Sequence, residues 1–141
     1  LQNFKQGIRG ARDDDTYGKQ MAAIATTLDG PGIKNVLAYL ATLPDLRAPA
    51  TVVGDSARGK SLYATCAECH GAAGEGIWST HAPRLAHMSD WYLARQLQNF
   101  RQGIRGGHLQ DFHGAQMVFM AKTVAHDRAT DDLLAYINTL R

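Results

Sequence analysis

Two cysteines and a histidine stand close together in the run Cys66-Ala67-Glu68-Cys69-His70. Thiols three positions apart can each form a thioether to a vinyl group of one porphyrin, and the histidine that follows is then placed to ligate the iron. The pattern Cys-x-x-Cys-His is the attachment signature of haem c. We therefore expect Cys66 and Cys69 to hold a covalent haem, with His70 as its proximal iron ligand.

Other functions for this motif, namely a zinc site, a redox pair or a disulfide, are less well supported by the sequence. A structural zinc site normally has four protein ligands, and the chain contains only these two cysteines. A thioredoxin-like redox pair is expected in a βαβ context, and no such context is visible. A disulfide between the two would close a loop too short to add much stability. With both thiols used by the haem, none remains for disulfides or nucleophilic catalysis.

The first ten residues recur later in the chain. Leu-Gln-Asn-Phe-Lys-Gln-Gly-Ile-Arg-Gly at 1–10 matches Leu-Gln-Asn-Phe-Arg-Gln-Gly-Ile-Arg-Gly at 97–106. The match continues to Met21, which pairs with Met117. With a slip of one residue it extends from 37–43 to 134–140. A repeat of this length indicates two copies of one structural unit.

The repeat predicts three parts. Residues 1–43 are the back half of a first unit, residues 44–52 are a linker with two prolines that favour extended chain, and residues 53–141 are a complete second unit. The front half of the first unit, with its own Cys-x-x-Cys-His, is expected before Leu1. About forty residues bury too little surface to be stable alone. We therefore expect residues 1–43 to need contacts from that front half, from the second unit or from another chain.

The complete unit shows helical periodicity and no alternating strand pattern, so the expected class is all-α. One helix should run into the haem motif, a second should cover 91–102, a short third should hold Met117, and a last should be capped by Thr130. The candidate capping residues of the first two helices are Asp55 or Ser56 and Ser89 or Asp90.

Residues 53–141 resemble a class I cytochrome c domain. The early Cys-x-x-Cys-His, the Pro-x-Leu at 83–85 and the late methionine carry the likeness. The Trp-Tyr-Leu run at 91–93, the Gln-Leu, Phe and Gly that follow it, and the tandem repeat are similar to the dihaem cytochrome c4 group. The resemblance implies the cytochrome c fold, one haem c in the complete unit and a second haem where the first unit is whole. Cytochrome domains fused to larger respiratory enzymes carry similar runs.

The sixth iron ligand could be Met88, Met117, Met120 or a histidine. The repeat favours Met117, because it pairs with Met21, whereas Met120 pairs with Ile24, which cannot ligate iron. The family also places its ligand methionine before the last helix. Met21 would then serve a first haem if one is present. The remaining histidines are expected to be ordinary loop or surface residues: His81, His87, His108, His113 and His126.

Further contacts to the haem and its ligands are expected, and the first rests on Pro83, which resembles the proline of the family's proximal loop. The Pro83 carbonyl should accept from the second ring nitrogen of His70 and so fix the orientation of the ring. Arg84, Trp91 and Tyr92 are candidates to hydrogen-bond the haem propionates. The apolar pocket is expected to include Leu85, Leu97 and Phe100.

Charge and hydropathy limit the partners. The chain has 15 basic and 13 acidic residues, a net charge of +2 that is spread evenly, so a general nucleic-acid surface is not expected. No apolar run approaches the ~20 residues that span a bilayer. The expected partners are redox proteins, donor and acceptor, and the expected location is the periplasm, with association with a membrane respiratory complex left open.

Histidine–methionine ligation fills both axial positions of the iron, so we expect an electron carrier and not an enzyme. Two such units in tandem would store two electrons or form a short relay. Two alternatives stay open. The chain could be the cytochrome part of a larger oxidase or dehydrogenase. It could instead be a ligand-binding or peroxidase-like haem protein if Met117 is displaced.

Overall fold

The computed structural model describes residues 1–124 and 126–140. Ala125 and Arg141, the last residue of the predicted second unit, lie outside the described residues. Within them the chain is helical, and its only β feature is an isolated bridge between Ile77 and Ala82, which confirms the predicted all-α class. The elements are α1 (Gln2–Lys5), α2 (Thr16–Thr26), α3 (Gly30–Thr42), α4 (Ser56–His70), the 3-10 helix η1 (Trp78–Thr80), α5 (Asp90–Arg101), α6 (Phe112–Thr123) and α7 (Asp127–Ile137).

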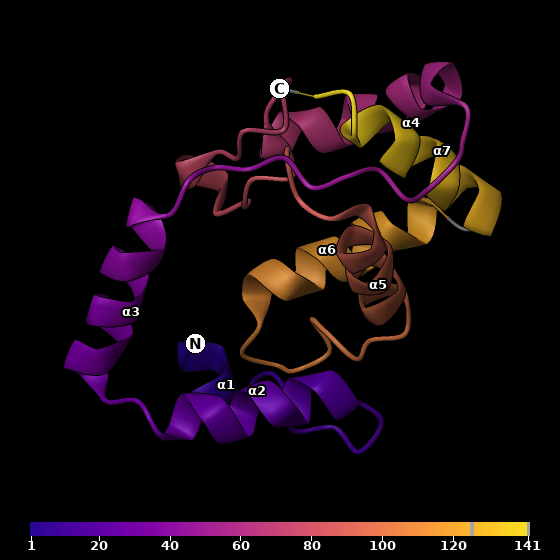
Figure 1. Cartoon of the computed structure of the whole chain (residues 1–141). Coiled ribbons are helices and arrows are strands. Elements are labelled where there is room, and N and C mark those ends of the chain that lie inside the picture. Colours follow the sequence, from indigo (N-terminus) through magenta and orange to yellow (C-terminus); the bar gives the residue numbers. More distant parts are fainter. Residues whose placement is uncertain (125, 141) are drawn as a thin grey trace.

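Helices α4 and α7 cross closely and form the centre of the second unit (Figure 1). Helix α4 begins where the sequence predicted, because the Asp55 carboxylate accepts the N–H groups of Ala57 and Arg58. Gly59 on α4 lies against the Asp132 carbonyl of α7. The core around this crossing contains Tyr63, Ala86, Leu93, Val124, Leu133, Leu134, Ile137 and Leu140.

The predicted start of the last helix is wrong by one turn. Helix α7 begins at Asp127, with His126 at its N-cap position. The Thr130 hydroxyl donates to the His126 carbonyl at 3.2 Å and accepts from Arg101, so Thr130 lies inside the first turn and does not cap it. Threonine can bond a carbonyl one turn back within a helix, and this pattern cannot be told from a cap by sequence.

The repeated segments have the same local structure. Asp15 caps α2 by accepting the N–H of Gly18, and its counterpart Asp111 caps α6 by accepting from Gly114. Gly10 and Gly106 share a positive φ, 77° and 80°. A Cβ on either one would meet the carbonyl of Gly18 or Gly114 respectively. The two copies therefore fold alike as far as the repeat extends.

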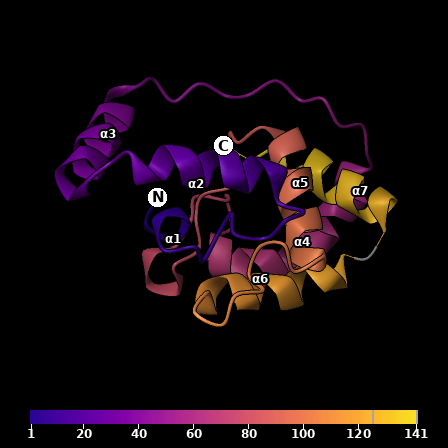
Figure 2. The ribbon, with the colours of Figure 1, turned by 90° about the horizontal axis from the view of Figure 1, so that it is seen from below.

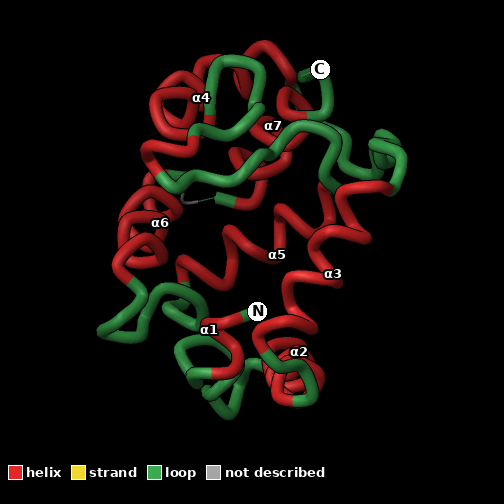
Figure 3. The backbone as a smooth tube through the Cα atoms, turned by 90° about the vertical axis from the view of Figure 1, so that its left-hand side faces the viewer, coloured by secondary structure: helices red, strands yellow, loops and turns green. Residues whose placement is uncertain are grey.

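Helices α1 and α2 lie at the end of the molecule away from α4 and α7, as the end-on and side views agree (Figures 2 and 3). The connection between α5 and α6 runs beside them (Figure 1). The contacts between the parts include the Arg95 guanidinium, which lies 4.2 Å from the centre of the Tyr17 ring, and a hydrogen bond from Arg12 to the Gly103 carbonyl at 3.4 Å.

Helix α3 stands to one side of the other helices (Figure 1). Of its residues only Ile33 is buried. Its counterpart in the second unit, α7, buries Leu133, Leu134 and Ile137. The large apolar side chains that α3 and its C-cap leave exposed are Val36, Leu37, Tyr39, Leu40 and Leu43.

The connection from α3 to α4 has no helix and runs along the second unit. The N–H and hydroxyl of Thr51 donate to the Asp90 carboxylate, and the Val52 N–H joins them. Ser89 or Asp90 was expected to cap α5. Ser89 occupies the N-cap position, but its side chain makes no capping hydrogen bond. The buried Asp90 carboxylate accepts from this connection, from Asn138 and from the N–H of Trp91. No described helix is long and apolar enough to cross a membrane.

Candidate haem-attachment site

His70 is the last residue of α4 and is almost completely buried. Its Nδ1 lies 2.7 Å from the carbonyl oxygen of Pro83, which is the hydrogen bond that the sequence predicted. The bond makes Nδ1 the donor and leaves Nε2 without a proton, as an iron ligand must be. Burial, the larger influence, lowers the pKa of His70 against the opposing effect of the Pro83 carbonyl, so the ring is neutral near pH 7.

The loop after α4 holds Pro83 in place. The N–H of Gly76 donates to the His70 carbonyl at 2.8 Å, and Gly76 has a φ of 82°. A Cβ on Gly76 would lie 2.6 Å from the backbone nitrogen of Arg84, so only glycine allows these two backbone segments to approach. The Gly74 carbonyl accepts from Leu85, which fixes the other side of the loop.

The two thiols of the motif are free. Cys66 is half-buried and packs against the core, and burial raises the pKa of its thiol. Cys69 is exposed. One thiol therefore faces the protein interior and the other faces outward, one turn of α4 apart, and the buried neutral imidazole follows directly. This donor set fits a haem attached by two thioethers.

Helix α6 presents two methionines as candidates for the sixth ligand. Met117 and Met120 are both half-buried, whereas Met88 is 38% exposed. Solvent exposure therefore does not distinguish Met117 from Met120 as the sixth ligand, and the assignment of Met117 still rests on the repeat. Met21, the counterpart of Met117 on α2, is 36% exposed.

Two histidines connect the loop after α4 to helix α6. The rings of His81 and His113 stack with centroids 4.3 Å apart, and Trp78 lies 6.3 Å beyond His81. Just before His81, the Thr80 hydroxyl donates to the Cys69 carbonyl at 2.8 Å. His113 lies one turn before Met117 on α6, so this stack joins the element that bears the methionine to the thiol motif. His81 and His113 were expected to be ordinary loop or surface residues, and both are exposed. No sequence signal marked the stack between them.

The three residues that were expected to hydrogen-bond the haem propionates, Arg84, Trp91 and Tyr92, have different surroundings. Arg84 donates to the Asp45 carboxylate and to Nδ1 of His87, at 2.7 and 2.6 Å, so its guanidinium is engaged with the connection from α3. Trp91 is 53% exposed and packs edge-on against the half-buried Tyr92. Of the predicted pocket residues, Leu85 and Leu97 pack against the core and Phe100 is buried.

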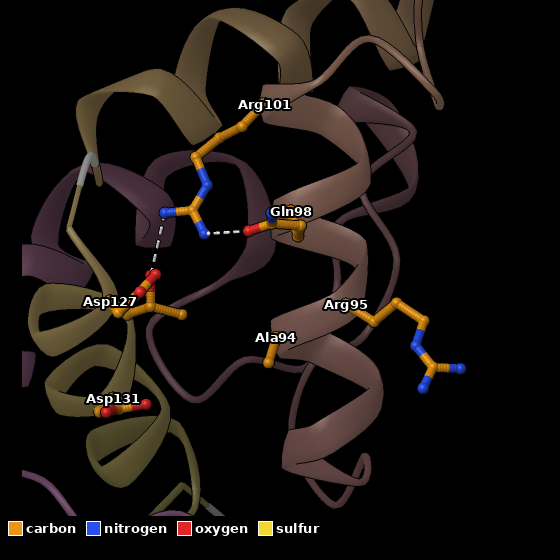
Figure 4. A pocket seen from close by; sticks show the side chains of 7 residues that line it. Ala94, Arg95, Gln98, Arg101, Asp127 and Asp131 are labelled. Atoms are coloured by element: carbon orange, nitrogen blue, oxygen red, sulfur yellow. Dashed lines mark hydrogen bonds between the residues drawn. The ribbon is translucent and has the colours of Figure 1, made fainter. Parts of the chain in front are cut away.

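A separate pocket of about 350 Å³ lies between α5 and α7 (Figure 4). Arg101 crosses it, donating to Gln98 at 2.9 Å and to the Thr130 hydroxyl at 3.2 Å, while Arg95 points away (Figure 4). Except for Ala94, the lining residues have polar or charged side chains, and none of them belongs to the Cys-x-x-Cys-His motif. Across residues 1–124 and 126–140, no group of three or more His, Cys, Asp or Glu is placed to hold a metal ion.

The chain matches the model of the family described as cytochrome c over residues 56–141. It is 33% identical over 86 residues to cytochrome c-554(548) of Halomonas halodenitrificans, in a match that covers 61% of this chain and 96% of that protein. It is 37% identical over 78 residues to the thiosulfate dehydrogenase electron acceptor of Thiomonas intermedia. That match covers 55% of this chain but only 32% of the relative, so the chain spans nearly all of the first protein and a third of the second.

A solved structure of cytochrome c4 from Acidithiobacillus ferrooxidans has a similar fold. The superposition has a TM-score of 0.73 at 23% sequence identity and covers 99% of this chain and 79% of that one. The fold likeness thus extends over residues before 56, beyond the part that the family model matches.

Proposed function

This chain belongs to the cytochrome c family and is an electron-transfer protein with covalently bound haem c, and we propose that His70 and Met117 are the two axial ligands of its iron. The thiols of Cys66 and Cys69 supply the thioethers. The observation that supports this arrangement best is the bond between His70 and Pro83, because it leaves Nε2 of a buried, neutral imidazole available.

The proposed Met117 ligand and the apolar residues around the site affect the reduction potential of the haem. The Met117 thioether is a soft donor that favours the reduced metal and raises the reduction potential relative to a second histidine. Leu85, Leu97 and Phe100 exclude water from the site and act in the same direction. When bound, the haem supplies one-electron chemistry. With His70 and Met117 both bound to the iron, no position would remain open for a substrate, which would suit a carrier.

We extend the proposal to residues 1–43 as the back half of a first cytochrome c unit. The shared geometry of Asp15 with Asp111 and of Gly10 with Gly106 supports it, as does the extent of the likeness to cytochrome c4. In a protein that contains the whole first unit, Met21 would be the sixth ligand of a second haem. Residues 44–52 are then the linker between the units.

The protein acts with other redox proteins, and it is placed in the periplasm in this proposal. Haem c is attached outside the cytoplasm, and the likeness to an electron acceptor of thiosulfate dehydrogenase is consistent with a dehydrogenase as donor. A role as the cytochrome part of a larger oxidoreductase remains the alternative. Such a role would keep the same ligands and change only the partner.

Covalent attachment is tested by exporting the 141-residue chain in a host with haem c maturation. Denaturing electrophoresis with haem staining should label the wild-type band, and acid acetone should not extract the haem. The variant Cys66→Ser/Cys69→Ser should lose the stain. Haem that is extracted from the wild-type chain would contradict the proposal.

A further inference from the structure

The connection between α3 and α4 is attached to the second unit along its length. It runs past the loop that follows α4 (Figure 1). Near its start, the Asp45 carboxylate accepts from the Arg84 guanidinium at 2.7 Å. Further along, the Ala48 N–H donates to the His87 carbonyl at 3.3 Å. Its end is held by the buried Asp90 carboxylate, so the connection is fixed against the second unit at its start, in its middle and at its end.

Arg84 belongs to the same peptide unit as the hydrogen-bond partner of His70. The Pro83 carbonyl oxygen, 2.7 Å from Nδ1 of His70, and the backbone nitrogen of Arg84 lie in one planar unit. Rotation of that unit would turn the oxygen away from the imidazole. On one side the unit packs against Gly76, where a Cβ would lie 2.6 Å from the Arg84 nitrogen. On the other side it continues to the Arg84 side chain, so a contact that holds this side chain also restricts the rotation.

The Arg84 guanidinium is held by two acceptors. Its Nη2 donates to the Asp45 carboxylate at 2.7 Å and to Nδ1 of His87 at 2.6 Å. Because arginine has only donors, Nδ1 of His87 must accept the second of these bonds. A single exposed ion pair adds little stability, but a network of several groups fixes its members more firmly. The network therefore fixes the orientation of Arg84 between the connection and the loop.

The backbone of His87 indicates that the connection helps to hold the loop in its shape. Its φ is 67°, in the left-handed region that residues other than glycine rarely adopt. Such a conformation costs free energy and persists where the surrounding contacts impose it. The His87 ring lies 3.3 Å from the Asp45 carboxylate, and the His87 carbonyl accepts from Ala48. Contacts with the connection are therefore part of what keeps this loop as it is.

We propose that Asp45 is a positioning residue for the proximal ligand, because it acts through Arg84 to orient the carbonyl that accepts from His70. This inference rests on the proposed function, in which His70 binds the iron. A well-placed acceptor for Nδ1–H makes the imidazole a stronger donor to the metal, which favours the oxidised state. Loss of the Asp45 contact loosens this hydrogen bond and raises the reduction potential. The connection thus adjusts the potential of the second unit without supplying a ligand.

The signs of two shifts in midpoint potential separate positioning from a direct effect of charge. Measured on the haem-loaded chain, Asp45→Asn and Arg84→Gln should both raise the potential, because each releases the peptide unit that faces His70. Charge acting directly on the haem would give opposite signs, since removal of a negative charge raises the potential and removal of a positive charge lowers it. Asp45→Glu keeps the carboxylate and should stay close to the wild-type value. Opposite signs, or an unchanged potential in Asp45→Asn, would overturn the proposal.

The double variant Asp45→Asn/Arg84→Gln leaves the net charge unchanged and completes a mutant cycle. Since both residues act through one contact, the double variant should raise the potential about as much as Asp45→Asn alone. A pure charge effect would largely cancel in it, and that result would contradict the proposal. Asp14→Asn is the matched control, because it breaks another exposed arginine–aspartate pair of the same 2.7 Å length, in the segment before α2. Its potential should stay near the wild-type value, and a shift equal to that of Asp45→Asn would also count against the proposal.

Solvent exchange of the Nδ1 proton of His70 reports the hydrogen bond itself. Followed by NMR on the reduced, haem-loaded chain, exchange should be faster in Asp45→Asn than in the wild type or in Asp14→Asn, because the Pro83 carbonyl protects this proton. The haem stain tests the proposed function separately. A wild-type chain without the stain would contradict the proposed function, and this inference with it. A stained protein in which Asp45→Asn changes neither the potential nor the exchange rate would contradict only the role of Asp45.

Discussion

Gly59 of α4 packs directly against the backbone carbonyl of Asp132 on α7, with no space for a side chain between them. A Cβ at this position would also lie 2.8 Å from Cβ of Tyr136. One turn further, the rings of Tyr63 and Tyr136 meet at a centroid distance of 5.4 Å. These contacts hold α4 and α7 close together where they cross.

Gly59→Ala should therefore destabilise the protein by about 1–3 kcal/mol, because the methyl group forces the two helices apart. Alanine is otherwise favoured over glycine within a helix by ~1 kcal/mol, so the sign of the effect separates packing from propensity. Urea unfolding of the haem-loaded chain measures it. Gly30→Ala on α3 is the control, since a Cβ there meets nothing within 4 Å. A stabilising Gly59→Ala would show that the helices do not cross as described.

The ionised Asp90 carboxylate should stabilise the folded chain by holding the connection between α3 and α4, and this contribution to stability should depend on pH. Burial alone would raise the pKa of Asp90, but hydrogen bonds from Thr51, Asn138 and Val52 outweigh it and hold the pKa well below the usual range. The folded chain thus binds fewer protons at this group than the unfolded chain. Its contribution to stability is complete above the unfolded pKa of about 4 and is lost as the pH falls through the folded value.

Asp90→Asn should cost about 1–3 kcal/mol at pH 7, because an amide group replaces an acceptor that faces several donors. The loss of stability between pH 5 and pH 2.5 should also be smaller in this variant than in the wild type. Thermal unfolding at pH 7 measures the first effect, and thermal unfolding between pH 5 and pH 2.5 measures the second. Asp14→Asn is the control, since Asp14 forms an exposed ion pair with Arg12 and should contribute little. A variant with unchanged pH dependence would exclude Asp90 as the titrating group.

What could be predicted from sequence was what depends on local spacing. The haem motif and the Asp55 cap lie within short stretches of a recognisable pattern, and the structure contains the cap. The Pro83 carbonyl as partner of His70 was implied by the family resemblance, and the structure contains this hydrogen bond too. The repeat also anticipated equal local geometry in the two copies, which Asp15 and Asp111 confirm.

What the sequence could not supply depends on contacts between distant segments. Asp90 has the sequence context of a helix cap, yet its side chain turns inward to residues almost forty positions earlier. His81 and His113 are 32 positions apart and meet only because the loop after α4 folds onto α6. Thr130 was assigned as a cap because hydroxyl residues serve both at caps and within first turns. Tertiary packing decides each of these cases.

Replacement of Met117 should change the iron site more than replacement of Met120. Met117→Ala should abolish the red-end absorption band of the oxidised protein, lower the reduction potential and let carbon monoxide bind the reduced form. Met120→Ala should keep the band and cost only packing free energy, roughly 2–5 kcal/mol at most. Both side chains are half-buried on the same helix, so each variant controls for the other. An exchange of the two outcomes would show that the repeat misassigns the ligand.

Helix α3 should be the part of the chain most open to proteolysis. It has 13 residues, and an isolated helix of about 12–15 residues is only marginally stable in water. Its apolar face, with Leu37, Tyr39 and Leu40, is exposed here, whereas α7 buries the corresponding face against α4. The sequence predicted that residues 1–43 need contacts from a missing front half, from the second unit or from another chain. Since Arg95 and Arg12 join α2 and the segment before it to the second unit, we now confine the weak region to α3.

Trypsin provides a matched comparison, because Lys34 on α3 and Lys60 on α4 are both exposed lysines within helices. Cleavage requires local unfolding, so its rate reports how firmly each helix is packed. Under native conditions cleavage after Lys34 should be much faster than after Lys60, and the fragment from 1 to 34 should stay associated with the second unit during gel filtration. Equal rates would mean that α3 is held as firmly as α4. A protein that includes the front half of the first unit should protect Lys34, since a helix equivalent to α4 would then cover the apolar face of α3.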